Sequence, residues 1–203
     1  MVKQLVETTN NILSPVYWKE ARNNLTNTRL LALSAIFLAM QCIMEGFFIP
    51  VGDNLRIYFS FLLVSLMAMI CGPVIALCYG FVQDLIGYML VPSGGFFFGY
   101  ILSSMAGAFI FALFFYRQRL SVVRIFLAKL LINVFVNIFM GSLWSAMLFG
   151  KGYYYYLVKS MIKNLMLLPV EVLLLISVFQ LILPIASQIP FLKLKPIKRI
   201  PLR

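Results

Sequence analysis

The chain has 203 residues, of which 63% are hydrophobic and only 11% are charged, and its mean hydropathy is +0.97. A soluble domain has about 45–50% apolar and about 25% charged residues, so this composition excludes a water-soluble globular fold and an intrinsically disordered chain. The remaining class is an all-α integral membrane protein with several spans. The net charge is +11, from 17 Lys and Arg residues against 6 Asp and Glu residues.

The first half of the chain predicts three transmembrane helices. Residues 1–28 contain no apolar run, so we expect no signal peptide there and an N-terminal segment outside the membrane domain. A transmembrane helix needs about 20 apolar residues, and the first run extends from Leu30 to Ile49. Residues 57–90 are too long for one span, and Gly72-Pro73 divides them because proline cannot continue a helix.

The second half predicts three more spans, at residues 96–116, 125–149 and about 156–185. We therefore expect six transmembrane helices within a membrane domain of residues 29–187. A basic tail, residues 188–203, follows this domain.

The basic residues predict the orientation of the chain in the membrane. Most of them lie before residue 30, between residues 117 and 124, or after residue 192. With six spans these segments share one side, which the positive-inside rule assigns to the cytoplasm together with both termini. The net charge is then mainly a topology signal, which requires no nucleic-acid partner, and the tail is placed to contact anionic lipid.

Ionisable residues within spans are costly and mark functional sites by default. The candidates are Glu45, Asp84, Lys129, Lys163 and Glu171. At a rise of about 1.5 Å per residue, Glu45 and Lys163 are expected in the outer half of the membrane, and Asp84 at or above its middle. Arg56 begins the second span at the outer surface, so these groups are placed to surround a pocket that opens outward. The alternative is a set of ion pairs between helices, for example Asp84 with Lys163, and Lys129 is expected to extend toward the inner interface.

Two patterns depend on helical spacing. Asn133 and Asn137 lie four residues apart and share a helix face, where they either bridge neighbouring helices or contact a ligand. Ala32, Ala35 and Ala39 place small side chains on one face of the first span, which allows another helix to approach closely. That helix belongs either to the same bundle or to a partner.

Four stretches of sequence together resemble a known family. They are residues 56–61 from Arg56; Gly72-Pro73 with Gly80, Asp84, Gly87 and Pro92-Ser93-Gly94; residues 96–100 with Leu102-Ser103; and residues 163–171 from Lys163 to Glu171, preceded by Trp144 and residues 149–151. Over about residues 29–185 the chain resembles the folate family (FolT) of substrate-binding S components of energy-coupling factor (ECF) vitamin transporters. The alanine pair Ala35 and Ala39 is similar to the family's alanine motif, which meets the coupling subunit.

The resemblance implies a multi-pass protein of the bacterial cytoplasmic membrane that captures folate outside and delivers it by reorienting in the membrane. It also implies a transmembrane coupling subunit (EcfT-like), contacted through Ala32, Ala35 and Ala39, and two ATPase subunits. The sequence contains no P-loop motif, so the energy has to come from another chain.

Folate combines a flat pterin ring, a benzoyl linker and a glutamate tail. The amino-pyrimidine edge of the pterin suits a carboxylate, the rings suit aromatic stacking, and the anionic tail suits Arg or Lys. The expected substrate-binding residues are Glu45, Arg56, Asp84, Phe98, Trp144, Lys163, Asn164 and Glu171. Among these, Arg56 and Lys163 are expected to hold the carboxylates of the ligand.

Three alternative functions follow from the same sequence. An S component for another vitamin, such as pantothenate or a thiamine precursor, differs only in its ligand. An intramembrane enzyme is disfavoured because the chain contains no histidine and no nucleophile–base pair. A scaffold without a ligand is disfavoured by ionisable residues on several spans. We expect no catalytic residue, no cofactor and no metal site, since the three cysteines have no metal-binding or redox spacing.

Overall fold

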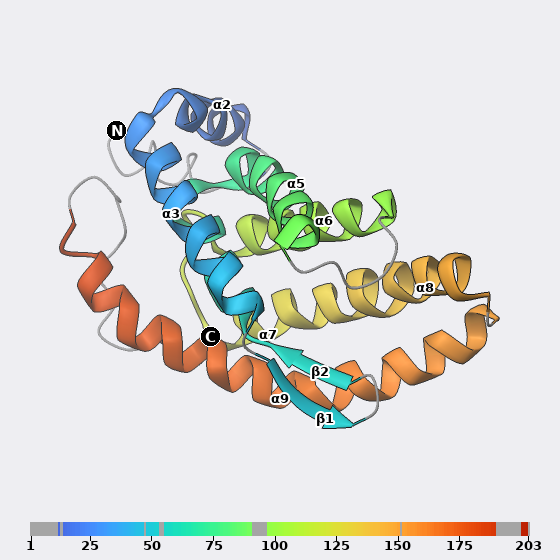
Figure 1. Cartoon of the computed structure of the whole chain (residues 1–203). Helices are drawn as coiled ribbons and strands as arrows, with labels where there is room; N and C mark the ends of the chain where they lie inside the picture. Colours follow the sequence, from blue (N-terminus) through green and yellow to red (C-terminus); the bar gives the residue numbers. More distant parts are fainter. Residues whose placement is uncertain are drawn as a thin grey trace.

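The computed structural model of the chain describes residues 12, 14–46, 48–52, 55–90, 97–150, 152–189 and 200–202, excluding the side chains of residues 45, 48–52 and 55–57. The first elements are α2 (Pro15–Asn23), the 3-10 turn η1 (Asn24–Thr26), α3 (Thr28–Glu45), and the strands β1 (Phe48–Gly52) and β2 (Leu55–Tyr58). They are followed by α4 (Ser60–Cys71), α5 (Pro73–Leu90) and α6 (Phe98–Phe115). A continuous rod of α7 (Val122–Leu131), the π-helix η2 (Ile132–Met140) and α8 (Gly141–Phe149) then leads to the long helix α9 (Tyr153–Ala186) (Figure 1).

Four helical segments of the described chain are long and apolar enough to cross a membrane: α5, α6, the α7–η2–α8 rod and α9. A fifth candidate combines α3 with α2, which are bent by 77° at their junction. Helix α4 has 12 residues and therefore a length of about 18 Å, less than the about 30 Å of a hydrocarbon core. The helical, multi-span membrane fold is thus supported, whereas six spans remain a prediction.

A β-hairpin lies where the first predicted span was expected to end and the second was expected to begin. Helix α3 stops at Glu45 instead of Ile49, and β1 pairs antiparallel with β2 from Phe48 opposite Tyr58. The segment contains a proline, which cannot donate a helical hydrogen bond, and β-branched residues, which favour strands. The predicted boundaries are wrong here, and the described fold is helical apart from this hairpin.

Two glycines set close approaches between helices. Gly72, between α4 and α5, has φ +90, and a Cβ there would lie 3.1 Å from the Tyr116 ring. Pro73 is the first residue of α5, a position where its missing N–H costs nothing, so the predicted break at Gly72-Pro73 is confirmed. A Cβ on Gly80 would lie 2.7 Å from Cα of Met105, which shows how closely α5 and α6 pack.

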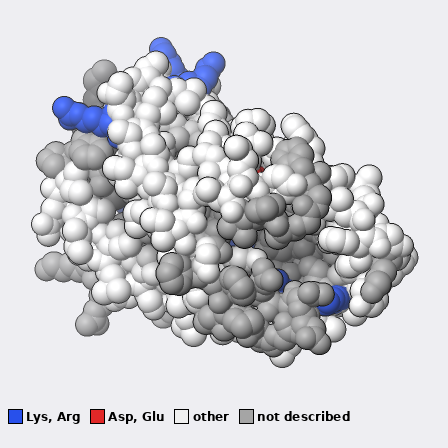
Figure 2. Space-filling model, viewed as in Figure 1, with Lys and Arg blue, Asp and Glu red and all other residues white. Residues whose placement is uncertain are grey.

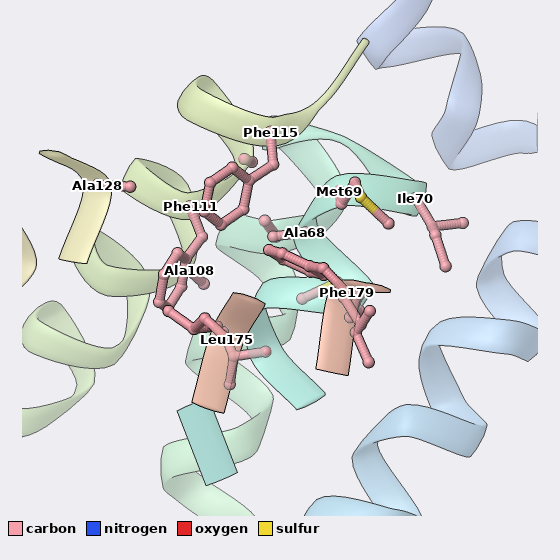
Figure 3. Packing of buried hydrophobic residues seen from close by; sticks show 14 of the residues in the cluster. Ala68, Met69, Ile70, Ala108, Phe111, Phe115, Ala128, Leu175 and Phe179 are labelled. Atoms are coloured by element: carbon pink, nitrogen blue, oxygen red, sulfur yellow. The ribbon is translucent and has the colours of Figure 1, made fainter. Parts of the chain in front are cut away.

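The core surrounds α4, in which every residue from Leu63 to Cys71 is buried. Figure 3 shows Ala68, from α4, among side chains of α6 and α9. The Phe115 ring stacks on Phe111 at 5.5 Å between centroids and meets Phe179 of α9 edge-on at 5.2 Å. Because α4 is covered on all sides, apolar residues all around it are consistent with a central position in the bundle.

Three segments that were predicted to share one side of the membrane meet at one end of the bundle. The turn after α6 contacts the N-terminal region through an ion pair between Arg117 and Glu20. The C-terminal residues contact the start of α7, where the backbone N–H groups of Val122 and Val123 donate to the carbonyls of Pro201 (3.0 Å) and Leu202 (3.3 Å). This arrangement agrees with the predicted topology, while the side of the membrane that this end faces stays a prediction.

Candidate functional site

A cluster of polar side chains joins α7 and η2 to α9 inside the bundle. We call it the polar cluster, and its members are Lys129, Asn133, Asn137, Ser160, Asn164 and Glu171. Of these residues, the sequence grouped only Asn133 and Asn137, and it gave no reason to include Ser160. The structure brings them together because the face of α7–η2 that carries Lys129, Asn133 and Asn137 packs against α9.

Glu171 is the centre of the polar cluster. One carboxylate oxygen lies 3.1 Å from Nζ of Lys129, and the other accepts a hydrogen bond of 2.8 Å from Nδ2 of Asn133. A buried charge is stable only with such partners. The carboxylate of Glu171 therefore holds α9 to α7 and η2. Binding of the pterin edge by the same carboxylate stays a prediction.

Lys129 does not extend to the inner interface as predicted. Its side chain is only 3% exposed, and its ammonium lies 4.2 Å from the centroid of the Phe61 ring besides its pairing with Glu171. A carboxylate and an aromatic face within reach satisfy the charge inside the bundle, so the side chain has no need to reach water. The expectation for this residue is wrong for that reason.

The Asn133 side chain bridges two helices, which is one of the two roles that the sequence left open, whereas the Asn137 side chain bonds to Asn133 on its own helix. Nδ2 of Asn137 donates to Oδ1 of Asn133 at 2.9 Å, and Nδ2 of Asn133 also lies 3.2 Å from the backbone oxygen of Asn164. Ser160 donates to the backbone oxygen of Asn137 at 3.0 Å. Both asparagines lie in the π-helix η2, and π-helical turns occur often at functional sites.

Lys163 lies on α9 one residue before Asn164 and is partly buried. Lys163 forms no ion pair with any residue of the described part of the chain. Asp84 instead accepts a hydrogen bond of 2.9 Å from Ser104, which joins α5 to α6. The ion pair between Asp84 and Lys163, one alternative from the sequence, is therefore not formed.

Trp144 forms an aromatic site with α6. Its indole N–H donates to Oγ of Ser103 at 2.9 Å, and its ring lies 5.5 Å from that of Phe97. A Cβ on Gly99 would lie 2.5 Å from Cδ2 of Trp144, so glycine at this position lets the indole approach the α6 backbone. Phe98 is 61% exposed, and the neighbouring Phe97 is the residue that contacts Trp144.

Two predicted site residues, Glu45 and Arg56, have side chains outside the described atoms. Two parts of the family stretches, Pro92-Ser93-Gly94 and Lys151, also lie outside the described residues. The predicted roles of Glu45 and Arg56 in ligand binding are therefore untested.

The three alanines of α3 lie on its outer face. Ala32, Ala35 and Ala39 are all exposed, and the large apolar side chains beside them are also exposed, at 57% for Ile36 and 46% for Met40. Packing within this bundle therefore does not explain the alanines.

The sequence analysis placed Phe97 and Ser103 in a family stretch but missed their contact with Trp144, and it missed the ion-paired state of Lys129. A signal existed for Lys129, since it lies four residues before Asn133 and eight before Asn137, on one helical face. The contacts of Phe97 and Ser103 with Trp144 had no such signal, because neighbouring Phe and Ser residues are equally plausible partners until the rotation of α6 about its axis is known.

Comparisons with known proteins agree on one family. Residues 29–192 match the family model described as the ECF transporter, substrate-specific component. A protein of Clostridium novyi (strain NT) named Folate transporter FolT is 30% identical over 73% of this chain and 86% of its own length. A FolT of Leuconostoc mesenteroides subsp. mesenteroides is 28% identical over 72% of this chain and 82% of its own. A crystal structure of FolT bound with folic acid superposes with a TM-score of 0.63 and 29% identity, covering 70% of this chain and 86% of that one.

Proposed function

The chain belongs to the family of substrate-specific (S) components of ECF transporters, and from this premise we propose that it captures folate. The similarity to a FolT structure that contains folic acid is the single observation that carries the proposal. The family consists of transporter components, and the relatives carry transporter names. Both relatives being named for folate favours folate over pantothenate or a thiamine precursor.

The described geometry fits a flat, anionic ligand. Lys163 offers a partly buried ammonium that has no ion pair within the described residues. Trp144 offers an indole oriented by Ser103. In this proposal Lys163 holds a carboxylate of the glutamate tail and Trp144 stacks on a ring of the ligand. Asn164 and Glu171 contribute mainly through the polar cluster, which fixes the position of α9 next to Lys163.

The ligand is tested by purifying the protein in a mild detergent and identifying co-purified small molecules by mass spectrometry. We expect folate or a reduced folate to be the bound species, with saturable binding when ligand-free protein is titrated with folate. Another vitamin in the spectrum, together with no binding of folate on titration, would contradict the folate assignment and leave the family assignment intact.

We further propose that the protein works with a transmembrane coupling subunit and two ATPase subunits in the bacterial cytoplasmic membrane. The alanine face of α3 (Ala32, Ala35 and Ala39) is the surface for the coupling subunit, because small exposed side chains allow a partner helix to approach closely. Delivery of folate to the cytoplasm then follows reorientation of the loaded protein in the membrane.

Ala35→Trp is expected to abolish co-purification with the coupling and ATPase subunits while folate affinity stays within about threefold, a change below 1 kcal/mol. An indole on the alanine face prevents close helix contact, and α3 is exposed at this position. Affinity purification of the co-expressed complex measures the first effect, and folate titration the second. The matched control is Leu181→Trp, at a position on α9 that is 71% exposed. A complex retained by Ala35→Trp would exclude this face as the interface.

A further inference from the structure

Helix α2 precedes the part of the chain that matches the family model, which begins at residue 29. It joins α3 through the turn η1, and the two helices are bent by 77° relative to each other. A helix that crosses a bilayer tilts by about 20° from the membrane normal on average. If α3 crosses the membrane, α2 therefore lies close to the membrane plane.

One face of α2 is fixed on the bundle. Tyr17 and Ala21 are 0% exposed, and the Tyr17 ring meets the Tyr116 ring edge-on at 5.5 Å. Asn24, directly after α2, donates from Nδ2 to the hydroxyl of Tyr116 at 2.9 Å and to the backbone oxygen of Cys71 at 3.0 Å. The orientation of the helix about its own axis is thereby set.

The opposite face of α2 is basic with apolar flanks. We call Val16, Lys19, Arg22 and the following Leu25 the α2 outer face, and all four are exposed. The acidic residue of α2, Glu20, is ion-paired with Arg117 and does not neutralise Lys19 or Arg22. Figure 2 shows basic atoms at the end of the molecule where Figure 1 places α2.

We propose that the α2 outer face binds anionic phospholipid headgroups and holds α2 on the membrane surface. A helix in the membrane plane with basic and apolar side chains on its outer face has the composition of an interfacial element. Lys19 and Arg22 place their charged ends among the phosphates, while Val16 and Leu25 reach the acyl boundary. A lipid is favoured over a protein because the attachment of α2 to α3 keeps it beside the bilayer.

The proposal rests on α2 and on a membrane crossing by α3, and not on the folate assignment, so the two fail independently. The experiment compares amide hydrogen exchange of residues 17–24 in nanodiscs of phosphatidylcholine with that in nanodiscs that also contain phosphatidylglycerol. A lipid that binds docked α2 lowers the population of its opened form. Each cation near an anionic surface contributes about fivefold, and we expect these amides to exchange at least about fivefold more slowly with phosphatidylglycerol.

The double variant Lys19→Gln/Arg22→Gln is expected to lose this difference, and the control Lys159→Gln, an exposed lysine on α9, to retain it. Soluble glycerol 3-phosphate, which has the headgroup phosphate without acyl chains, is expected not to reproduce the slowing. Equal exchange in both kinds of nanodisc would overturn the proposal, as would a difference that the double variant retains. Slowing by a co-expressed protein but not by phosphatidylglycerol would likewise overturn it.

Discussion

Lys163→Ala is expected to weaken folate binding by more than about tenfold, a loss of about 1.4 kcal/mol or more. The Lys163 ammonium is partly buried on α9, and no ion pair in the described chain engages it. A charge-assisted hydrogen bond to a ligand carboxylate in such a setting is about twice as strong as a neutral one. Titration of ligand-free protein in detergent with folate measures the change.

The control for this prediction is Lys159→Ala, which removes the ammonium of an exposed residue one helical turn before Lys163. We expect its folate affinity to stay within about threefold of the parent protein, because an exposed charge in high dielectric contributes little. Equal affinity of Lys163→Ala and the parent protein, with both variants folded, would show that Lys163 does not hold the ligand. Equal losses in both variants would indicate a general electrostatic effect instead.

Lys129→Met is expected to lower the free energy of unfolding by about 3–5 kcal/mol, the usual cost of leaving one member of a buried ion pair alone. The substitution leaves the Glu171 carboxylate inside the bundle with the Asn133 amide as its hydrogen-bond donor among the described side chains. Unfolding of the purified protein by heat or denaturant in detergent, in the absence of folate, measures the effect.

A double variant separates the ion pair from the packing around it. Lys129→Met/Glu171→Gln contains no buried charge, and its glutamine retains a side-chain oxygen for Asn133. We expect it to be more stable than Lys129→Met alone, with a coupling energy of about 1 kcal/mol or more between the two positions. The control Lys159→Met, on the exposed face of α9, is expected to change stability by less than about 0.5 kcal/mol. Additive effects at positions 129 and 171 would contradict the pairing.

These two predictions assign different tasks to neighbouring parts of α9. Lys163 is expected to bind the ligand, whereas Glu171 is expected to stabilise the position of the helix that carries Lys163. Pro169 lies between them inside α9, and proline removes one backbone hydrogen bond from a helix. The polar cluster spans this weakened point from Ser160 and Asn164 to Glu171, so it stabilises α9 where the backbone alone is least able to do so.

The sequence by itself determined the class of the protein and most of its helices. Its apolar fraction requires lipid around the chain, and runs of about 20 apolar residues placed the later helices within a few residues of their observed bounds. Gly72-Pro73 marked the break between α4 and α5 because its reason is local: a positive φ at Gly72 and a proline at the first position of α5. The four stretches around Arg56, Asp84, Phe98 and Lys163 were enough to indicate the family.

Only the tertiary structure decided which polar groups satisfy one another. From the sequence, Glu171 was compatible with a ligand and with an ion pair between helices, and its partner Lys129 lies 42 residues away in the chain, so only the packing of α7 against α9 identified the pair. Asp84 likewise accepts a hydrogen bond from Ser104 rather than pairing with Lys163, because α5 packs against α6. The hairpin after α3 and the docking of α2 also depend on contacts between distant segments, because strands need a partner strand and a short helix is marginal alone. Hydropathy reports the preference of each residue for lipid, whereas the pairing of buried charges is set by which helix faces meet.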